Sequence, residues 1–187
     1  MEDLPDPVSY VSVDALDSTH FVVAWRNDNA SPYPGSAIVG TVSGGNTISY
    51  PGADTVFNFA STNYTSVAAL DSNKFVVAYQ DNGNSDKCTG IIGDVSGGNS
   101  ISFNSEEICK DDPVSYVAAT PLSTSSFAVA WRNDNAAPYP GSAIVGLDSA
   151  GGAVPEFSDY VLIGTVILAI GLMFKFVPKI NPKMRGA

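Results

Sequence analysis

Two loops of the sequence concentrate oxygen-bearing side chains. They read Arg26-Asn27-Asp28-Asn29 and, in a second copy, Arg132-Asn133-Asp134-Asn135, and the stretch QDNGN at residues 80–84 has a similar composition. Carboxylate and amide oxygens are the ligands that Ca²⁺ prefers, which makes Asp28, Asp81 and Asp134 weak calcium candidates. Each loop holds a single carboxylate, however, and Asx turns that bond their own backbone explain the composition equally well. We therefore expect no cofactor and no obligatory metal.

The same loops combine aromatic rings with arginine. Tyrosine and tryptophan offer a large apolar area together with a hydrogen-bonding group, which suits a surface that binds a glycan or a protein. The alternative is that the tryptophans end buried strands and pack in the core. The candidate ligand loops comprise Trp25, Arg26, Asp28 and Tyr33 and their copies Trp131, Arg132, Asp134 and Tyr139.

The sequence offers no catalytic residues. His20 is the only histidine, and the corresponding positions of the repeat hold Lys74 and Ser126, which is typical of a solvated strand start. There is no Ser–His–Asp set, no glycine-rich phosphate loop between a strand and a helix, and no His/Cys metal cluster. We therefore predict that the protein is not an enzyme.

The two cysteines, Cys88 and Cys109, flank a glycine-asparagine turn. If the turn is centred between residues 98 and 99, Val95 faces Ser102 and the two cysteines face each other. This arrangement predicts a cross-strand disulfide, which an exported domain can form. The alternative is a pair of buried free thiols.

These loops belong to an internal repeat. WRNDNASPYPGSAIVG at 25–40 recurs as WRNDNAAPYPGSAIVG at 131–146, and a diverged copy lies at 78–93. A period of 52–54 residues is typical of propellers and solenoids. Matching positions of the three units are Tyr10, Tyr64 and Tyr116; Phe21, Phe75 and Phe127; and Gly40, Gly93 and Gly146.

Each unit reads as a series of strands. Unit one offers SYVSVD (9–14), HFVVAW (20–25), SAIVGTVS (36–43) and TISY (47–50), separated by turn residues. The run HFVVAW is apolar throughout, as in a strand that is buried on both faces. We predict an all-β fold of three four-stranded, propeller-like blades in an incomplete or open array, with a sandwich or solenoid as the alternative. The units span about 9–62, 63–114 and 115–153, within an ectodomain of residues 1–153.

The pattern "ALDS–FVVAY–D–N–G–AIVG–VSG–ISF" resembles a family of extracellular, propeller-like repeats. The matching residues in unit one are 15–18, 21–25, 37–40 and 42–44, and unit two matches through 69–72, 75–79, 95–97 and 101–103. The resemblance covers about residues 9–149 and implies architecture only.

Charge is divided between the two parts of the chain. Residues 1–158 hold 18 acidic and 5 basic residues, and residues 159–187 hold one acidic and four basic residues. An acidic domain of this kind argues against nucleic acid as a partner, because binding to phosphates needs a basic surface.

The end of the sequence predicts a membrane anchor. Residues 160–174 carry no charge, and the apolar stretch extends to residue 178, long enough to span a bilayer. All four basic residues follow residue 174: Lys175 lies near the end of this stretch, and the other three lie in the tail, 179–187, which should be cytoplasmic and leave the repeats outside.

A linker, 154–159, precedes this segment and contains Pro155-Glu156-Phe157. The motif, the apolar segment and the basic tail together resemble PEF-type sorting signals, which archaeosortase/exosortase-like transpeptidases recognise. The resemblance implies that these three residues are a sorting motif and that a transpeptidase is a partner.

The sequence therefore predicts a cell-surface protein that is either held by a single membrane pass or processed onto another anchor. The expected function is adhesion or ligand binding. The alternative is a structural surface-layer or sheath component that assembles through its β-repeats.

Overall fold

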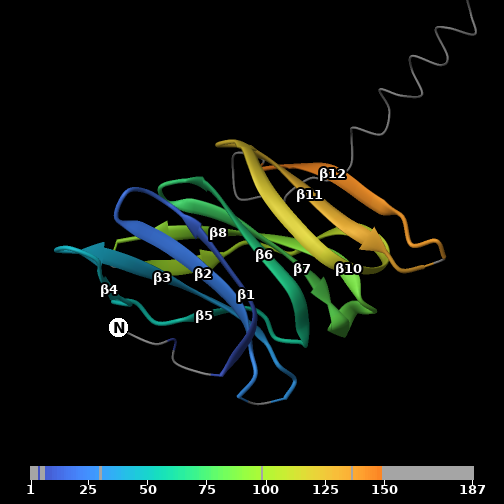
Figure 1. Cartoon of the computed structure of the whole chain (residues 1–187), viewed down its shortest axis with the longest axis horizontal. Coiled ribbons are helices and arrows are strands. Elements are labelled where there is room, and N and C mark those ends of the chain that lie inside the picture. The colour runs from blue at the N-terminus through green and yellow to red at the C-terminus, as the bar shows by residue number, and fades with distance from the viewer. Residues whose placement is uncertain (1–3, 5–6, 30, 98, 136, 149–187) are drawn as a thin grey trace, which may run out of the picture. The chain divides into compact units, whose positions relative to one another are not determined.

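A computed structural model of the chain describes residues 4, 7–29, 31–97, 99–135 and 137–148. These residues form antiparallel β-strands and one short 3₁₀ turn, so the predicted all-β class is confirmed (Figure 1). The linker with Pro155–Phe157, the apolar segment 160–178 and the basic tail lie outside the described residues. Within the described part of the chain, no helix is long and apolar enough to cross a membrane.

Each unit is built on a meander of antiparallel strands, to which β5 of unit one adds a further pairing with β3. Unit one contains β1 (Val8–Ala15), β2 (His20–Asn27), β3 (Gly35–Ser43), β4 (Thr47–Ser49) and β5 (Thr55–Asn58). Unit two contains β6 (Thr62–Asp71), β7 (Lys74–Asp81), the turn η1 (Asn82–Asn84), β8 (Lys87–Ser96) and β9 (Ser100–Phe103). The last strands are β10 (Glu107–Ser123), β11 (Ser126–Asn133) and β12 (Gly141–Leu147).

The strands form two sheets, and the predicted propeller is wrong. One sheet has the order β1-β2-β3-β4, with β5 also paired to β3; the other has the order β12-β11-β10-β8-β7-β6, with β9 paired to β8. The described strands do not close into a ring. The reason is the long strand β10. Its first part pairs with β8 as far as Pro113, and its second part pairs with β11 from Val114 onward, so units two and three share one sheet.

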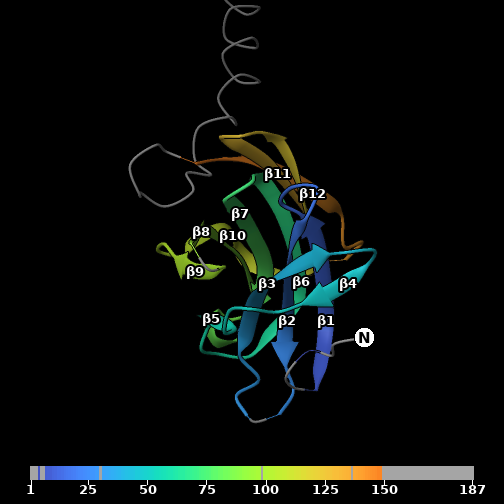
Figure 2. The ribbon, with the colours of Figure 1, turned by 90° about the vertical axis from the view of Figure 1, so that its left-hand side faces the viewer.

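The units stack face against face (Figures 1 and 2). We call the face of a unit that packs on the preceding unit its front face, and the opposite face its back face. The back face of unit one packs on the front face of unit two, and the back face of unit two packs on the front face of unit three. The first of these cores joins Leu16, Val22, Ala24, Ala37 and Val39 to Val67, Phe75, Val77, Tyr79 and Ile91.

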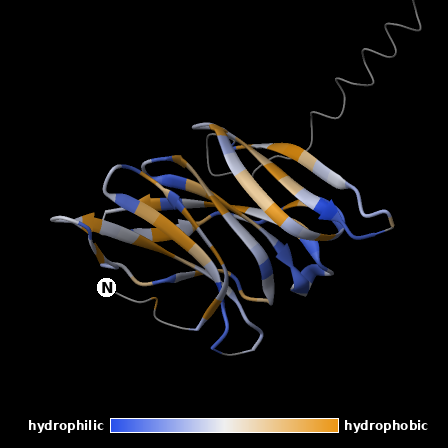
Figure 3. Ribbon diagram, viewed as in Figure 1, coloured by the Kyte–Doolittle hydropathy of each residue, from blue (hydrophilic) through white to orange (hydrophobic). Residues whose placement is uncertain are grey.

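This stacking explains the continuous apolar runs of the middle strands. In β7, Phe75, Val77 and Tyr79 belong to the core with unit one, whereas Val76 and Ala78 belong to the core with unit three. Figure 3 shows the hydrophobic colour along the strands of all three units. Burial of a large apolar side chain stabilises a fold by about 1.5–3 kcal/mol, so a strand buried on both faces contributes twice to the stack.

Side chains of one unit also hold the backbone of the next. The Ser12 hydroxyl accepts a hydrogen bond from the Val67 amide at 3.0 Å, and Asp14 accepts one from the Ala69 amide at 2.8 Å. One unit further on, Ser66 accepts from the Ala119 amide at 2.9 Å. The first strands of consecutive units, β1, β6 and the second part of β10, are therefore tied together in series.

The predicted disulfide between Cys88 and Cys109 is confirmed, with their Cα atoms 5.2 Å apart. The predicted register is wrong by one residue in the β8–β9 hairpin, because Val95 faces Ile101 and not Ser102, but it is right where β8 first pairs with β10. The pairing shifts before β10, where Gly90 faces Glu107, and shifts again next to the cysteine, where Cys88 faces Lys110. Irregular pairing between β9 and β10 thus restores the approach of the two sulfur atoms.

A phenylalanine faces a glycine at the same place in each unit, and in units one and two its ring lies over that glycine. Phe21 faces Gly40, Phe75 faces Gly93 and Phe127 faces Gly146 on the neighbouring strand. A Cβ atom on Gly93 would lie 2.3 Å from the Phe75 ring, which is fully buried. The repeated Phe–Gly pairs are therefore a packing requirement, because only glycine leaves room for the ring.

We expect Gly93→Ala to lower the free energy of unfolding by about 1–3 kcal/mol, because the methyl group displaces a ring that cannot move within a packed core. Gly97→Ala is the matched control, since a Cβ at Gly97 meets no atom within 4 Å. Urea denaturation followed by tryptophan fluorescence measures both. Equal stability of the two variants would contradict the packing argument.

Candidate functional site

A row of tyrosines runs across the three stacked units. Tyr10, Tyr64 and Tyr116 stand at the same position of the repeat, and each has a positive φ of 50–53°. The cause is a bulge. Ser9 faces Arg26 and Ser12 faces Ala24, so two residues, Tyr10 and Val11, oppose Trp25 alone. A non-glycine residue in this conformation is strained, and such strain persists at functional sites or where packing enforces it.

The stacking of the units brings the three rings into contact. The ring centroids of Tyr10 and Tyr64 lie 5.2 Å apart, and those of Tyr64 and Tyr116 lie 5.1 Å apart. Burial and the neighbouring Tyr10 and Tyr116 raise the pKa of Tyr64 above its ordinary value. The end rings are open to solvent, with exposures of 38% for Tyr10 and 63% for Tyr116.

An arginine is held between two tyrosines at each end of the row. The guanidinium carbon of Arg26 lies 4.8 Å from the ring centroid of Tyr10 and 5.5 Å from that of Tyr33. Arg132 lies at the same distances from Tyr116 and Tyr139. Cation–π contacts of this kind stabilise partly exposed sites by about 0.5–1 kcal/mol each. We call these two groups the Arg–Tyr clusters.

Neighbouring polar groups fix the two arginines. Arg26 Nε donates to Asp28 Oδ1 at 2.6 Å, and its Nη1 donates to Asn63 Oδ1 of unit two at 2.7 Å. Arg132 Nε donates to Asp134 Oδ1 at 2.6 Å, which lowers the pKa of the Asp134 carboxyl. The arginines therefore hold the tyrosine rings in place. Because the arginines are already bonded, the exposed tyrosine rings are the groups available to contact a ligand.

The loops that carry Tyr33 and Tyr139 have matching geometry. The Asn27 side chain accepts from the Asn29 amide at 2.9 Å, and the Asn133 side chain accepts from the Asn135 amide at 3.0 Å. Both loops contain a cis proline bond, and Tyr33 and Tyr139 have positive φ. These are the Asx turns that the sequence analysis weighed against calcium binding.

Unit two departs from this arrangement. Gln80 takes the position of the arginines, donates its amide to the Val114 carbonyl oxygen and accepts from Asn63 at 3.0 Å. Asp81 caps the short turn η1 by accepting from the Gly83 amide. Unit two thus supplies only Tyr64 to the row, and its loop serves the contacts between units.

The structure separates the candidate residues into two groups. Trp25 and Trp131 lie in the cores and do not reach the surface, whereas Arg26, Asp28 and Tyr33 and their copies form the Arg–Tyr clusters. Asp28, Asp81 and Asp134 each bind groups of their own loop. In the part of the chain that the structure describes, no group of three or more acidic, histidine or cysteine side chains could hold a metal ion.

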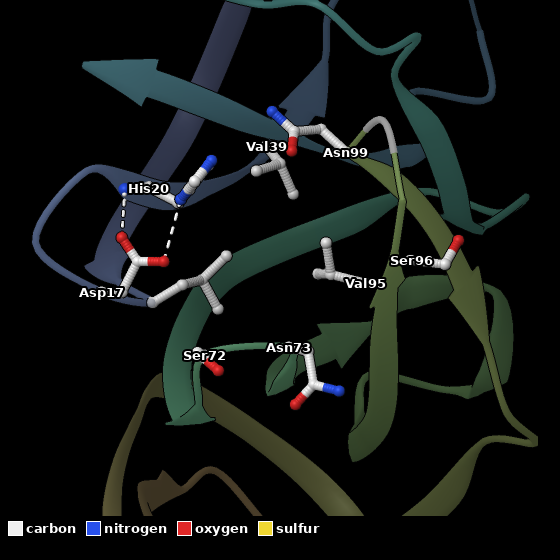
Figure 4. Close-up of a pocket in the computed structure, with 9 residues that line it drawn as sticks. Asp17, His20, Val39, Ser72, Asn73, Val95, Ser96 and Asn99 are labelled. Carbon is white, nitrogen blue, oxygen red and sulfur yellow. Dashed lines mark hydrogen bonds and ion pairs between the residues drawn. The ribbon is translucent and has the colours of Figure 1, made fainter. Parts of the chain in front are cut away.

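A second feature is a shallow pocket of about 210 Å³ between units one and two (Figure 4). Asp17, His20 and Val39 lie on one side, and Ser72, Asn73 and Val95 lie on the other. His20 Nδ1 lies 2.9 Å from Asp17 Oδ2. Hydrogen bonds from the Thr19 amide and from His20 hold the pKa of Asp17 well below its usual range. This carboxylate caps its own turn and orients the histidine ring, while the rest of the pocket is lined by short polar and aliphatic groups.

Sequence reasoning missed the tyrosine row and the pocket. Tyr10, Tyr64 and Tyr116 were recognisable as matching positions of the repeat, which is the signal from which the row could have been found. His20 was expected to be a solvated strand start, and its pairing with Asp17 across the turn could not be read from the repeat.

The comparison of this chain with protein-family models and with curated proteins found no match. The interpretation of the site therefore depends on its geometry.

Replacement of Arg26 by lysine should lower the free energy of unfolding by about 1–2 kcal/mol, because lysine lacks the planar fork that stacks on tyrosine and reaches Asp28 and Asn63 together. Arg132→Lys is the matched variant. It removes the same stack but no bond to a following unit, so its effect on urea denaturation should be smaller. Equal effects would show that the bond to Asn63 contributes nothing.

Proposed function

We propose that the protein is a cell-surface-anchored binding module and that the tyrosine row with its two Arg–Tyr clusters is the surface that binds a polypeptide partner. The observation that carries this proposal is the continuous row of three tyrosine rings in contact, whose two end rings, Tyr10 and Tyr116, are exposed and held by arginines. Tyrosine and arginine are enriched in protein interfaces, and tyrosine provides contact area at a low cost in conformational entropy.

The preorganisation of the row supports a binding role. Tyr10 and Tyr116 keep a strained backbone and are held by stacked arginines, so little further ordering is needed when a ligand arrives. Binding sites gain affinity when such ordering has been completed beforehand. The three rings follow one another across the first strands of three units, which fits an extended polypeptide segment.

The electrostatics of the domain indicate the character of the partner. All five lysines and arginines of the described residues form ion pairs with aspartates, which are Asp28, Asp148, Asp111, Asp112 and Asp134. The remaining carboxylates leave the domain strongly acidic, so a basic or neutral segment fits and nucleic acid does not.

Surface anchoring is the second part of the proposal. It is supported by the uncharged stretch at 160–174 and the basic residues that follow it. In this proposal Pro155, Glu156 and Phe157 are the recognition residues of a sorting transpeptidase, and the repeats face outward. The alternative role, a structural layer built from the repeats, is favoured by the apolar side chains left exposed at both ends of the stack, such as Val13 and Leu122.

Binding can be tested by panning a displayed random-peptide library against the full chain in detergent. We expect enriched peptides whose affinity falls about tenfold or more with Tyr10→Ala/Tyr116→Ala, because these rings are the exposed contacts. Phe59→Ala is the control, since Phe59 is an aromatic residue with 80% exposure that lies outside the row.

Two outcomes would contradict the polypeptide proposal. One is a set of peptides that bind the double variant as well as the original chain. The other is a glycan array on which only glycans are retained.

Anchoring can be tested by cell-free synthesis of the chain in the presence of microsomes. The full chain should resist alkaline extraction, whereas Ile167→Asp/Ile170→Asp should be extracted, because a charge at the centre of a spanning helix costs about 2.5–3.5 kcal/mol. Lys183→Gln, which lies in the basic tail, is the control. Extraction of the unchanged chain would argue against a spanning segment.

A further inference from the structure

The back face of unit three is open, although its counterparts in units one and two are buried. Leu122 is 58% exposed, whereas the matching Leu16 and Leu70 are 7% and 6% exposed. Ala130 is exposed, and the matching Ala24 and Ala78 are fully buried. The residues that form this face resemble those of unit one closely, and we call Tyr116, Ala118, Leu122, Ala130 and Ala143 the tail surface.

The front face of unit one is open along β1. Val13 is 61% exposed and Val11 is 52% exposed. At the matching positions of the later units, Val67 and Val117 are buried against the preceding unit. We call Tyr10, Val11 and Val13 the head surface. The other half of this front face, with Val23, Trp25 and Ile38, is covered by residues that include Leu4 and Tyr50.

The head and tail surfaces are the two halves of a contact that the chain already makes twice. Within the chain, β1 lies on β6 and β6 lies on β10, with stacked tyrosines and hydrogen bonds between side chain and backbone at each step. We propose that the tail surface of one copy binds the head surface of a second copy, so that β10 of one chain takes β1 of the next as its neighbour.

This proposal goes beyond ligand binding by the tyrosine row and uses different residues as its test. A contact between two different surfaces of the same chain is heterologous, and it generates rings or open filaments rather than a closed symmetric dimer. It would place Tyr116 of one copy beside Tyr10 of the next and so continue the row.

The contact between copies should be weaker than the contacts within a chain. Ser12 and Ser66 accept hydrogen bonds from the next unit, but Ala118 takes their place in unit three and has no acceptor. In addition, half of the front face of unit one is already covered, so a second copy can contact this face only along β1. Association should therefore depend on protein concentration.

The first experiment is disulfide trapping with the full chain in detergent. In the contact between units two and three, Ser66 lies beside Ala119, and the corresponding pair between copies is Ala118 and Val13. Mild oxidation of Val13→Cys/Ala118→Cys should give a ladder of dimers, trimers and larger species on a non-reducing gel. Val13→Cys/Ser124→Cys, in which the second cysteine lies in the exposed β11 turn, should not give a ladder.

The second experiment measures mass by light scattering with the detergent subtracted. The original chain should form species larger than a monomer as concentration rises, and Leu122→Asp should remain monomeric with an unchanged melting temperature, because Leu122 is already exposed. Phe59→Asp is the control and should associate as the original chain does.

Three results would overturn the proposal. The original chain could remain monomeric at every concentration. Association could persist in Leu122→Asp, as contacts through the apolar C-terminal segment would allow. Finally, the single variant Val13→Cys could form cross-linked dimers as efficiently as the double variant forms its ladder of species. That result would indicate a symmetric contact between two head surfaces.

Discussion

The two-sided burial of the middle strands is the constraint on which this structure depends. β2 and β7 carry apolar side chains on both faces, so each needs a packing partner in front and another behind. A single meander cannot supply both. For β7 the stacking of successive units supplies both partners, whereas for β2 unit two covers one face and residues that include Leu4 and Tyr50 cover the other. The Phe–Gly pairs let large rings lie against a neighbouring strand within this packing. The same requirement explains why a stack must either be covered at its ends or expose apolar surface there.

The tyrosine row is a consequence of that stacking. Each bulge at the start of a first strand turns one tyrosine into a left-handed backbone conformation, and the stack then brings the three rings to about 5 Å from one another. The arginines that lie between tyrosines at both ends make the arrangement rigid. Strain at three equivalent positions, together with two exposed end rings, is the basis of the binding role proposed for the row.

Several polar contacts also join one unit to the next. Lys74 of unit two binds Asp148 at the end of unit three at 2.6 Å, and Arg26 of unit one binds Asn63 of unit two. Because the described lysines and arginines are engaged with aspartates, the acidic surplus is left to dominate the surface. The proposed basic or neutral partner matches this acidic surplus, and the proposed contact between copies joins head and tail surfaces made of uncharged residues.

Most of the local structure could be predicted from the sequence, because strand period and turn chemistry act over a few residues. The repeat, the strands 9–14, 20–25, 36–43 and 47–50, and the Cys88–Cys109 bond all follow from patterns of that range. β5 and the first part of β10 were missed. The former is short, and the latter holds four charged residues and Pro113, so neither has the alternation or the apolar run of a typical strand. These two segments decide how the units join, and so the number of sheets was wrong.

What the sequence by itself determined is the unit: its meander, its loops and the residue types at each matching position. What only the tertiary structure decided is how the units meet. Tyr10, Tyr64 and Tyr116 are more than fifty residues apart along the chain, and no local pattern shows that their rings touch or that Trp25 turns inward while Tyr33 stays outside. Those outcomes depend on the packing of whole faces against each other, which is set by contacts distant in sequence.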